Sequence, residues 1–389
     1  MKYFFLIFLS LILAGVTIDL GYMAYAEESS FNNKNSKHKD LQFQNYTSSY
    51  KSQLILVLNG TSFTDSPNNN SLSLQGFNET DVRKKLPTET SKTTSAKQTT
   101  KNNTFNIAIA GDWGCNPNAK RTSQNIQNND PELVIASGDL SYRPTGDCWF
   151  NQISPFKSKM KIAMGDHEYS DTVGGKKGIK KEYLKPLNLT KTYYSFDINN
   201  VHVVVIDPHI DYSPTSKQYR FIENDLKTAS TNPDTDWIFA VNSTPMYTSP
   251  SEHSADSSLR DTFHPLFDKY DVDLVLVSDN HNYQRTFPIK YNSENESSKP
   301  IIVDKNHTKY KDQLGQIYLI VGTAGRSLYD LKGQAPFVAK QSDDHFGFLN
   351  LEINDEYIEG TFYSNKKDDI SGKNNISNKI VDQFIILSS

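Results

Sequence analysis

The 389-residue sequence has few cysteines, little net charge and almost no long apolar runs. Two cysteines allow at most one intramolecular disulfide bond. The 41 Lys and Arg nearly balance the 45 Asp and Glu, and a formal charge of -4 argues against nucleic-acid binding driven by bulk charge. One apolar run, residues 4–16, is short for a membrane span, and no later stretch is apolar enough to cross a bilayer. The length favours one large domain with a polar tail.

The first 26 residues have the features of an export signal. Lys2 supplies positive charge, residues 4–16 are almost wholly apolar, and Ala24 and Ala26 fit the small-residue cleavage pattern. We predict that residues 1–26 are a signal peptide or, because the cleavage pattern is far from the apolar run, an uncleaved N-terminal anchor. A buried N-terminal helix is the alternative. The protein is therefore expected to be extracytoplasmic, secreted or membrane-anchored at the cell surface, with this segment as its membrane contact.

Residues 27–104 are dominated by Asn, Ser, Thr, Lys and Gln. Such a composition cannot bury enough apolar surface to offset the entropy lost on ordering. We predict a polar, disordered linker, in which residues 54–58 are the one stretch apolar enough for a lone strand. Residues 105–389 are expected to form the folded domain.

From residue 105 onward, predicted strands and helices alternate. Apolar runs predict strands at Phe105–Ala110, Leu133–Ala136 and 161–164, with a helix at 119–128. Further strands are expected at 193–196, 201–206, Trp237–Val241 and Leu274–Val277, and further helices at 216–229 and 259–270. This alternation indicates an α/β domain.

The last third of the chain is richer in strands than in helices. Strands are expected at Ile317–Val321, 346–353, 357–363 and 380–387. We expect them to form a largely antiparallel second sheet. The predicted fold class is therefore α/β (α+β, four layers), with two packed mixed β-sheets flanked by helices.

Four short motifs follow predicted strands. They are Gly-Asp-Trp-Gly at 111–114, Gly-Asp-Leu-Ser-Tyr at 138–142, Gly-Asp-His-Glu at 165–168 and Ser-Asp-Asn-His at 278–281. Carboxylates, a phenol and imidazoles that converge at sheet edges suit a cluster of metal ions. Such a cluster serves the hydrolysis of phosphate esters, in which metals supply charge stabilisation and a hydroxide nucleophile.

Four of these side chains form the first predicted metal position. Asp139 is the candidate bridging ligand, because a carboxylate has two oxygens and a full charge, and Asp112 is a terminal ligand. Tyr142 follows Asp139 closely enough for both to reach one cation, and His281 offers a nitrogen. A phenol loses its proton near neutral pH only on a strongly Lewis-acidic ion, which points to Fe(III). The alternatives are acids that cap turns, a packed tyrosine and an ordinary loop histidine.

With these motifs, the chain resembles the calcineurin-like metallophosphoesterase superfamily and, within it, the purple acid phosphatases. The motif Thr-Pro-Met-Tyr at 244–247, the helical segment 218–226, and Tyr283 and Arg285 after His281 add to the resemblance, which extends from residue 105 to residue 365. Gly114 fits the purple acid phosphatase branch, because other branches have a ligand histidine there. The resemblance implies the metallophosphatase sandwich and an acid phosphatase-like hydrolase.

Three positions depart from the family pattern, and all belong to the second metal position. The family has Asn where this chain has Asp166, and it has His where this chain has Ser243 and Asp279. We expect Asp166 and Asp279 to be metal ligands and Ser243 to be a non-ligand. An all-oxygen site favours Mn, Mg or Ca over Zn, with Fe as a further choice for this divalent ion. The added negative charge also repels phosphate, so the second site is altered, weaker or empty.

Two histidines are expected to act in catalysis. His167 resembles the family histidine that contacts the substrate phosphate or the leaving group, and His253 is placed to protonate a leaving alkoxide. The predicted function is an exported metal-dependent phosphatase that hydrolyses small phosphate monoesters by metal-bound hydroxide, with no nucleic-acid partner. The alternatives are a phosphodiesterase or nucleotidase on the same fold, and a degenerate, non-catalytic metal-binding module.

The two cysteines lie just beyond two of the metal-type loops. Cys115 follows Asp112, and Cys148 follows Asp139. Outside the cytoplasm we expect them to pair and to rigidify the site, with two unconnected thiols as the alternative.

Overall fold

The computed structural model describes residues 5–13, 16–24, 104–169, 179–311, 314–365 and 379–388. The chain divides into two units, Met1–Ser95 and Ala96–Ser389. In the first unit, β1 (Phe5–Leu13) pairs antiparallel with β2 (Val16–Ala24). The export signal expected at 1–26 stays a prediction. The linker expected at 27–104, with its strand at 54–58, lies outside the described residues except for residue 104.

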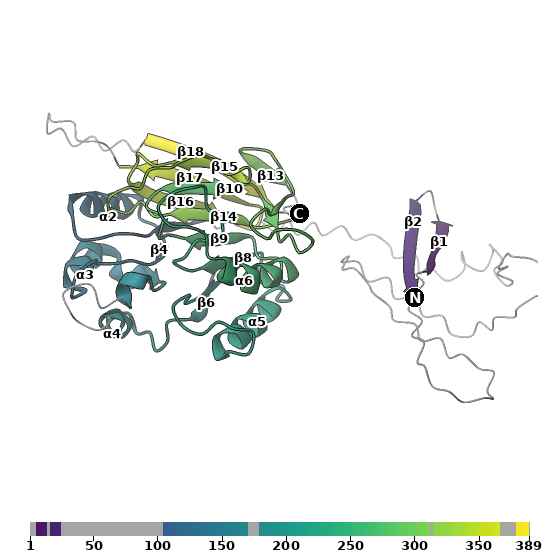
Figure 1. Cartoon of the computed structure of the whole chain (residues 1–389), viewed down its shortest axis with the longest axis horizontal. Coiled ribbons are helices and arrows are strands. Elements are labelled where there is room, and N and C mark those ends of the chain that lie inside the picture. Colours follow the sequence, from purple (N-terminus) through teal and green to yellow (C-terminus); the bar gives the residue numbers. More distant parts are fainter. Residues whose placement is uncertain are drawn as a thin grey trace, which may run out of the picture. The chain divides into compact units, whose positions relative to one another are not determined.

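Two seven-stranded mixed sheets form the second unit (Figure 1). The first has the order β13-β18-β17-β16-β3-β4-β5. Its strands are β13 (Lys309–Lys311), β18 (Lys379–Leu387), β17 (Tyr357–Ser364), β16 (Gly347–Ile353), β3 (Phe105–Ala110), β4 (Leu133–Ala136) and β5 (Met160–Ile162). The second has the order β15-β10-β14-β9-β8-β7-β6. Its strands are β15 (Val338–Ser342), β10 (Tyr283–Thr286), β14 (Ile317–Val321), β9 (Leu274–Val277), β8 (Trp237–Val241), β7 (Val201–Val205) and β6 (Tyr194–Ile198). A short pair, β11 (Ile289–Lys290) and β12 (Ile301–Ile302), stands apart.

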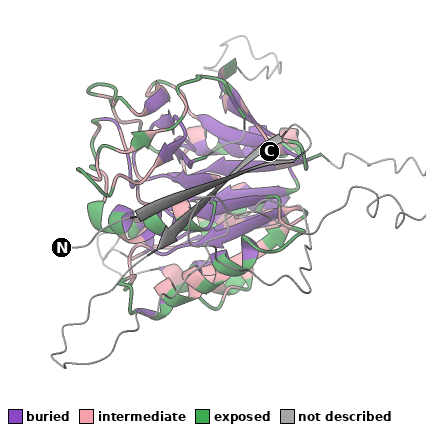
Figure 2. Cartoon of the chain, turned by 90° about the vertical axis from the view of Figure 1, so that its right-hand side faces the viewer, coloured by how far each residue is buried: buried purple, intermediate pink, exposed green. Residues whose placement is uncertain are grey.

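Alternate side chains of the central strands enter different cores, which creates four layers. Ile107 and Ile109 of β3 face the core between the two sheets, whereas Ala108 and Ala110 face a separate core. Two helices, α2 (Pro117–Asn129) and α3 (Asp147–Ile153), contribute Ile126 and Trp149 to that separate core. Two others, α5 (Lys217–Ala229) and α6 (Ser257–Lys269), pack on the second sheet. Figure 2 shows the buried strands with helices outside them. The predicted four-layer fold class is confirmed.

One part of the topological prediction is wrong. The C-terminal strands β16 to β18 are antiparallel to one another, as expected, but they extend the sheet of β3 to β5. Strand β14 instead pairs parallel with β9 in the other sheet. The strand pattern predicts where strands occur, but the choice of neighbour depends on contacts between distant segments. Short elements such as the helix α4 (Lys180–Leu184) and the strands β10, β13 and β15 were not predicted.

The topology brings the motif loops to one edge. Strands β3, β4 and β5 are parallel, with Ala110 opposite Ala136 and Ala136 opposite Ile162, so their carboxyl ends open at the same place. The end of β9 meets this edge from the other sheet, because the Ser278 hydroxyl donates to the Ser137 carbonyl at 2.8 Å. The loops that follow these four strands therefore lie together.

Candidate metal centre

Four side chains converge on one point at this edge. Tyr142 Oη lies 3.0 Å from Asp112 Oδ1, 3.0 Å from Asp139 Oδ2 and 3.0 Å from His281 Nε2. His281 Nε2 lies 3.5 Å from Asp112 Oδ1. The sequence predicted these four residues as one ligand set, and the structure brings all four together.

The donor set suits a cation. The His281 imidazole faces a backbone carbonyl with Nδ1, at 2.7 Å from the Ser327 oxygen, so Nδ1 carries the proton and Nε2 presents a lone pair to the centre. Burial lowers the pKa of His281 to about 4, against the raising effect of that hydrogen bond, so the ring is neutral at pH 7. The single Tyr142 proton can satisfy only one of three acceptors, whereas a metal ion would satisfy all of them.

The electrostatics of the acids support the same fit. Burial, and next the charge of Asp279, raise the pKa of Asp112 well above its ordinary value. Burial and the charge of Asp112 do the same for the pKa of Asp139. Burial and these two carboxylates also raise the pKa of the Tyr142 phenol. Such crowding of buried acids is costly unless a positive charge lies among them.

Unusual backbone conformations aim these side chains. Asp112, Asp139, Tyr142 and Asp279 all have positive φ, between 53° and 71°. Non-glycine residues adopt this region rarely and at a cost, which is typical of functional sites. Gly165 packs against the cluster so closely that a Cβ there would lie 1.9 Å from Asp139 Oδ1. The loops are thus shaped around the carboxylates.

Glu168 is a site residue for which the sequence reasoning assigned no role. It is fully buried, and its Oε2 accepts from the amides of Asp139 at 3.1 Å and Gly165 at 2.9 Å. Its Oε1 accepts from the Leu140 amide at 3.0 Å. One carboxylate therefore ties the loop that carries Asp139 to the loop that carries Asp166. Its place in the Gly-Asp-His-Glu motif was the feature of the sequence that could have pointed to a role at the site.

A second group of donors surrounds the other side of Asp139. Ligand atoms of Asp139, Asp166 and His167 all lie within 4.8 Å of one another. Burial lowers the pKa of His167, whose Nδ1 is buried without a hydrogen-bond partner among the described residues. Asp166 is exposed.

The remaining predicted residues lie around these two groups. Asp279 belongs to neither, and its backbone amide donates to Asp112 Oδ2 at 2.9 Å. The pKa of the Asp279 carboxyl is raised to about 6, chiefly by burial. His253 is exposed, and its ring packs edge-on against Tyr329, with the ring centroids 5.4 Å apart. Ser243 is buried next to the centre.

The segment after β14 also borders the centre, and the sequence reasoning missed it. The Tyr329 ring stacks on His281, with the centroids 3.9 Å apart. The Arg326 amide donates to the Asp112 carbonyl at 2.8 Å, and its exposed guanidinium lies over the Tyr142 ring, 4.8 Å from the centroid. Among the described residues, Arg326 forms no ion pair with an acidic side chain. The sequence around Arg326, Gly-Thr-Ala-Gly-Arg, gives no indication that this residue lies beside the centre.

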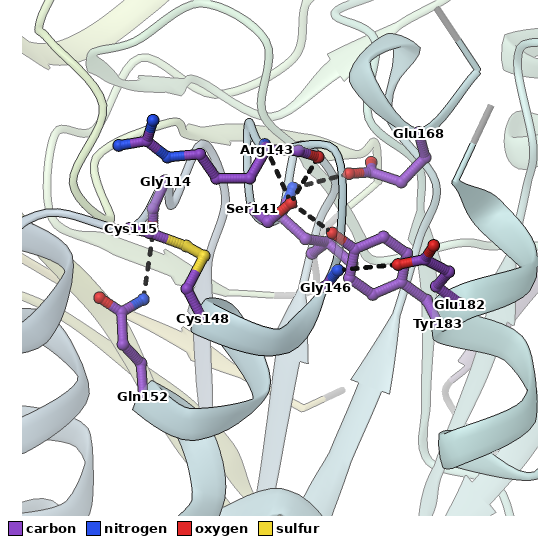
Figure 3. The surroundings of a disulfide bond; sticks show 11 residues. Gly114, Cys115, Ser141, Arg143, Gly146, Cys148, Gln152, Glu168, Glu182 and Tyr183 are labelled. Carbon is purple, nitrogen blue, oxygen red and sulfur yellow. Dashed lines mark hydrogen bonds between the residues drawn. A yellow bond between two sulfur atoms is a disulfide. The ribbon is translucent and has the colours of Figure 1, made fainter. Parts of the chain in front are cut away.

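A disulfide bond braces the first loop, as the sequence predicted. Cys115 is bonded to Cys148 of α3, with the Cα atoms 5.9 Å apart (Figure 3). On the same helix, Gln152 Nε2 donates to the Gly114 carbonyl at 3.0 Å. The backbone beside Asp112 is therefore held to α3 by one covalent bond and one hydrogen bond.

Comparisons with known proteins find one family model and several curated relatives. Residues 105–283 match the family model described as calcineurin-like phosphoesterase. Purple acid phosphatase 23 of Arabidopsis thaliana is 28% identical over 256 residues, which are 56% of this chain and 52% of that protein. Probable inactive purple acid phosphatase 24 of the same plant is 29% identical over 250 residues, which are 58% of this chain and 40% of that protein. The chain thus spans about half the length, or less, of these two curated relatives.

A solved structure shares the fold. A purple acid phosphatase from yellow lupin (Lupinus luteus) seeds matches 73% of this chain and 54% of its own, with a TM-score of 0.60 and 23% identity. At this identity the match shows the architecture, and the chemistry rests on the residues described above.

Proposed function

From the premise that residues 105–283 form a calcineurin-like phosphoesterase domain with purple acid phosphatases as its relatives, we propose that the chain is a metal-dependent phosphomonoesterase. The observation that supports the proposal most is the convergence of Asp112, Asp139, Tyr142 and His281 around one point. These residues would hold Fe(III), because a phenolate ligand matches a strongly Lewis-acidic ion. Asp139 would be shared with a second divalent ion near Asp166.

The metal pair, when bound, supplies positive charge at the phosphoryl oxygens and a nucleophile drawn from water. The chain's own residues orient the substrate. Arg326 presents an exposed, planar guanidinium beside Tyr142, which suits two oxygens of a phosphate. His167, kept neutral by burial, would hydrogen-bond a phosphoryl oxygen or the leaving group. His253 at the rim would deliver a proton to the leaving alkoxide.

The same proposal includes export from the cytoplasm. The disulfide between Cys115 and Cys148 is typical of an oxidising compartment. The sequence pattern of residues 1–26 points the same way. Across the part of the chain that the structure describes, no helix has the length and apolarity needed to span a membrane.

The test combines spectroscopy with activity. Purified full-length protein is loaded with iron and a divalent ion, assayed on p-nitrophenyl phosphate, and scanned for visible absorbance. We expect hydrolysis that a chelator abolishes, together with a visible band from the Tyr142–Fe(III) pair. Tyr142→Phe should lose the band while keeping its iron, whereas Tyr329→Phe, in which a neighbouring phenol is removed, should keep the band. Protein that is fully metal-loaded, colourless and inactive would overturn the proposal.

A non-catalytic metal-binding module is the second candidate. It is favoured by Ser243 and Asp279, which replace family histidines, and by relatives that are named probable inactive phosphatases. The triple variant Asp166→Asn, Ser243→His and Asp279→His separates the two. If it gains a phosphatase activity that the natural chain lacks, the natural chain is degenerate. If the natural chain is active and the variant is impaired, the natural residues are an adaptation.

A further inference from the structure

Three alternate amide side chains contact one loop beside the centre. Asn280, Asn282 and Gln284 are all buried, and each hydrogen-bonds residues 248–253 of the loop between β8 and α6. The side chains between them have other partners, and the first of these, His281, faces the candidate metal centre. This short segment therefore supports the loop with one row of side chains and contributes to the centre with the other.

Asn280 binds the backbone of His253 through both of its polar groups. Its Oδ1 accepts from the His253 amide at 3.0 Å, and its Nδ2 donates to the His253 carbonyl at 2.9 Å. The same Nδ2 also donates to the Thr248 hydroxyl at 3.0 Å. Both amide protons and one lone pair of the Asn280 side chain thus serve this loop.

The other two amides hold an earlier part of the loop. Asn282 Nδ2 donates to the Ser251 hydroxyl at 2.9 Å, and Gln284 Oε1 accepts from the Ser249 amide at 2.7 Å. The hydrogen bonds of the described residues give neither of these two side chains a contact with His253. The support of that residue within this row therefore comes from position 280.

The histidine held in this way borders the centre. His253 is exposed, and its ring packs against Tyr329, with the centroids 5.4 Å apart. Tyr329 in turn stacks on His281 at 3.9 Å, and its amide donates to the His281 carbonyl at 3.0 Å. Asn280 directly precedes His281 in the chain. The backbone at these two positions therefore sets the spacing between a candidate metal ligand and the histidine at the rim.

An exposed imidazole on a loop needs such support to act as a general acid. The donor nitrogen has to come within about 2.6–3.2 Å of the leaving-group oxygen. A loop with a free backbone would sample many other positions, because its conformational entropy favours them. Hydrogen bonds to the amide and the carbonyl of the same residue remove much of this freedom.

We propose that Asn280 is a positioning residue that holds His253 where it protonates the leaving group. The inference rests on the proposed function, in which His253 is the proton donor. As the bond from phosphorus to the leaving oxygen breaks, the His253 imidazolium gives its proton to that oxygen and an alcohol departs. The nucleophile from water forms the new bond to phosphorus, and the neutral imidazole regains a proton from solvent.

The experiment compares two leaving groups in full-length, metal-loaded protein. Ethyl phosphate releases a basic alkoxide that needs a proton, whereas p-nitrophenyl phosphate releases a phenolate that leaves without one. We expect Asn280→Ala and His253→Ala each to lower kcat for ethyl phosphate at least about 10-fold, and the double variant to be no slower than His253→Ala. With p-nitrophenyl phosphate, each variant should stay within about 3-fold of the wild type.

Asn354→Ala is the matched control. Asn354 is also buried, and its Oδ1 accepts from the amides of Glu356 and Tyr357 at 2.8 and 2.9 Å in the turn between β16 and β17. This turn lies at the end of the sheet away from the centre, because Ile353 pairs with Phe105, the first residue of β3. The control should change kcat for both esters by the same factor.

Hydrogen exchange tests the contact without turnover. In the wild type, the His253 amide should exchange at least about 10-fold more slowly than the amide of exposed Ser254, which has no partner among the described residues. Asn280→Ala should abolish this difference. If that variant does not fold, the wild-type measurement decides, because equal exchange of the two amides would overturn the inference.

The inference and the proposed function fail separately. If the wild type is active but Asn280→Ala slows both esters equally, Asn280 does not act through His253 and the inference falls. It also falls if Asn280→Ala slows the His253→Ala protein by its full factor. If the wild type hydrolyses neither ester, the phosphatase proposal falls together with the catalytic part of the inference, and protection of the His253 amide would still support its placement by Asn280.

Discussion

At the scale of single residues, the main feature of the site is that several acidic side chains lie close together. Asp112 and Asp139 are buried, and Asp166, Glu168 and Asp279 raise the pKa of one or both of them. Glu168 differs from the others, because its two oxygens are occupied by three backbone amides. It acts as a positioning residue that holds the two loops together, whereas Asp112 and Asp139 face the centre.

Substituting Glu168 tests this positioning role. In Glu168→Gln, one amide oxygen still accepts, but the NH₂ group faces a backbone N–H and leaves it unpaired, which should destabilise the fold by about 1–3 kcal/mol. Metal affinity should fall with it, because Asp139 loses its support. Glu182→Gln is the control, since Glu182 is exposed and accepts from one amide, that of Gly146 at 3.0 Å. Urea unfolding and metal titration measure both effects, and equal stability of the two variants would contradict the role.

At the scale of elements, a histidine links the β6–β7 hairpin to α5. His202 Nδ1 lies 2.7 Å from Asp197 Oδ1, and Nε2 lies 2.9 Å from Asp225 Oδ2. Burial acts to lower the pKa of His202, but the hydrogen bonds and charges of the two carboxylates outweigh it and raise the pKa. The protonated ring therefore stabilises the contact between helix and hairpin.

This contact gives stability a defined dependence on pH. Because the folded-state pKa exceeds the unfolded value of about 6.5, the stabilisation is complete below about pH 6.5 and is lost as pH rises through the folded-state pKa. We expect His202→Gln to lower the melting temperature more at about pH 6 than at about pH 9. His307→Gln is the control, because the His307 ring faces a carbonyl, that of Ala339, instead of a carboxylate. A pH-independent difference between His202→Gln and wild type would contradict the prediction.

At the scale of the whole domain, a buried ion pair joins the two sheets. Arg285 of β10 donates from Nε to Asp382 Oδ2 at 2.7 Å and from Nη2 to Asp382 Oδ1 at 3.0 Å, and Asp382 belongs to β18 of the other sheet. Tyr283 and Tyr310 complete the network, with hydroxyls at 2.8 Å from Asp382 and 2.7 Å from Arg285. The pair favours one alignment of the sheets, since both partners are buried and each satisfies the charge of the other.

Breaking one half of this pair should be more harmful than removing both. Asp382→Asn leaves a buried guanidinium without its counter-charge, at an expected cost of about 3–5 kcal/mol. The double variant Arg285→Met with Asp382→Leu should recover most of that loss, because no unpaired charge remains. For comparison, Asp130→Asn at the exposed pair with Lys159 should cost about 0–1 kcal/mol. Guanidinium unfolding distinguishes these values, and a double variant as unstable as the single one would refute the account.

Much of the fold could be read from local pattern. The strands at Phe105–Ala110, Trp237–Val241 and Leu274–Val277 agree with the structure because continuous apolar, β-branched runs suit strands that are buried on both faces. The strands expected at 193–196 and 201–206 are β6 and β7, and Asn199 between them has the positive φ that such tight turns need. The four-residue β10 and the three-residue β13 are too short for a periodic pattern of apolar residues to be recognised in the sequence.

The residues of the candidate site also divide into those that the sequence predicted and those that it did not. Asp112, Asp139, Tyr142 and His281 were predicted together because each stands at the end of a strand, where parallel topology gathers side chains. Arg326 and Tyr329 had no such signal. Their places depend on loops from distant parts of the chain, which folding brings to the same edge.

The sequence by itself determined the layers, most of the strands and the acids that converge at the candidate centre, because periodicity and strand ends are local properties. The tertiary structure alone decided which strands share a sheet, which carboxylate braces the loops, and which segment after β14 borders the centre. Those outcomes depend on contacts between residues far apart in the chain, and no local pattern records them.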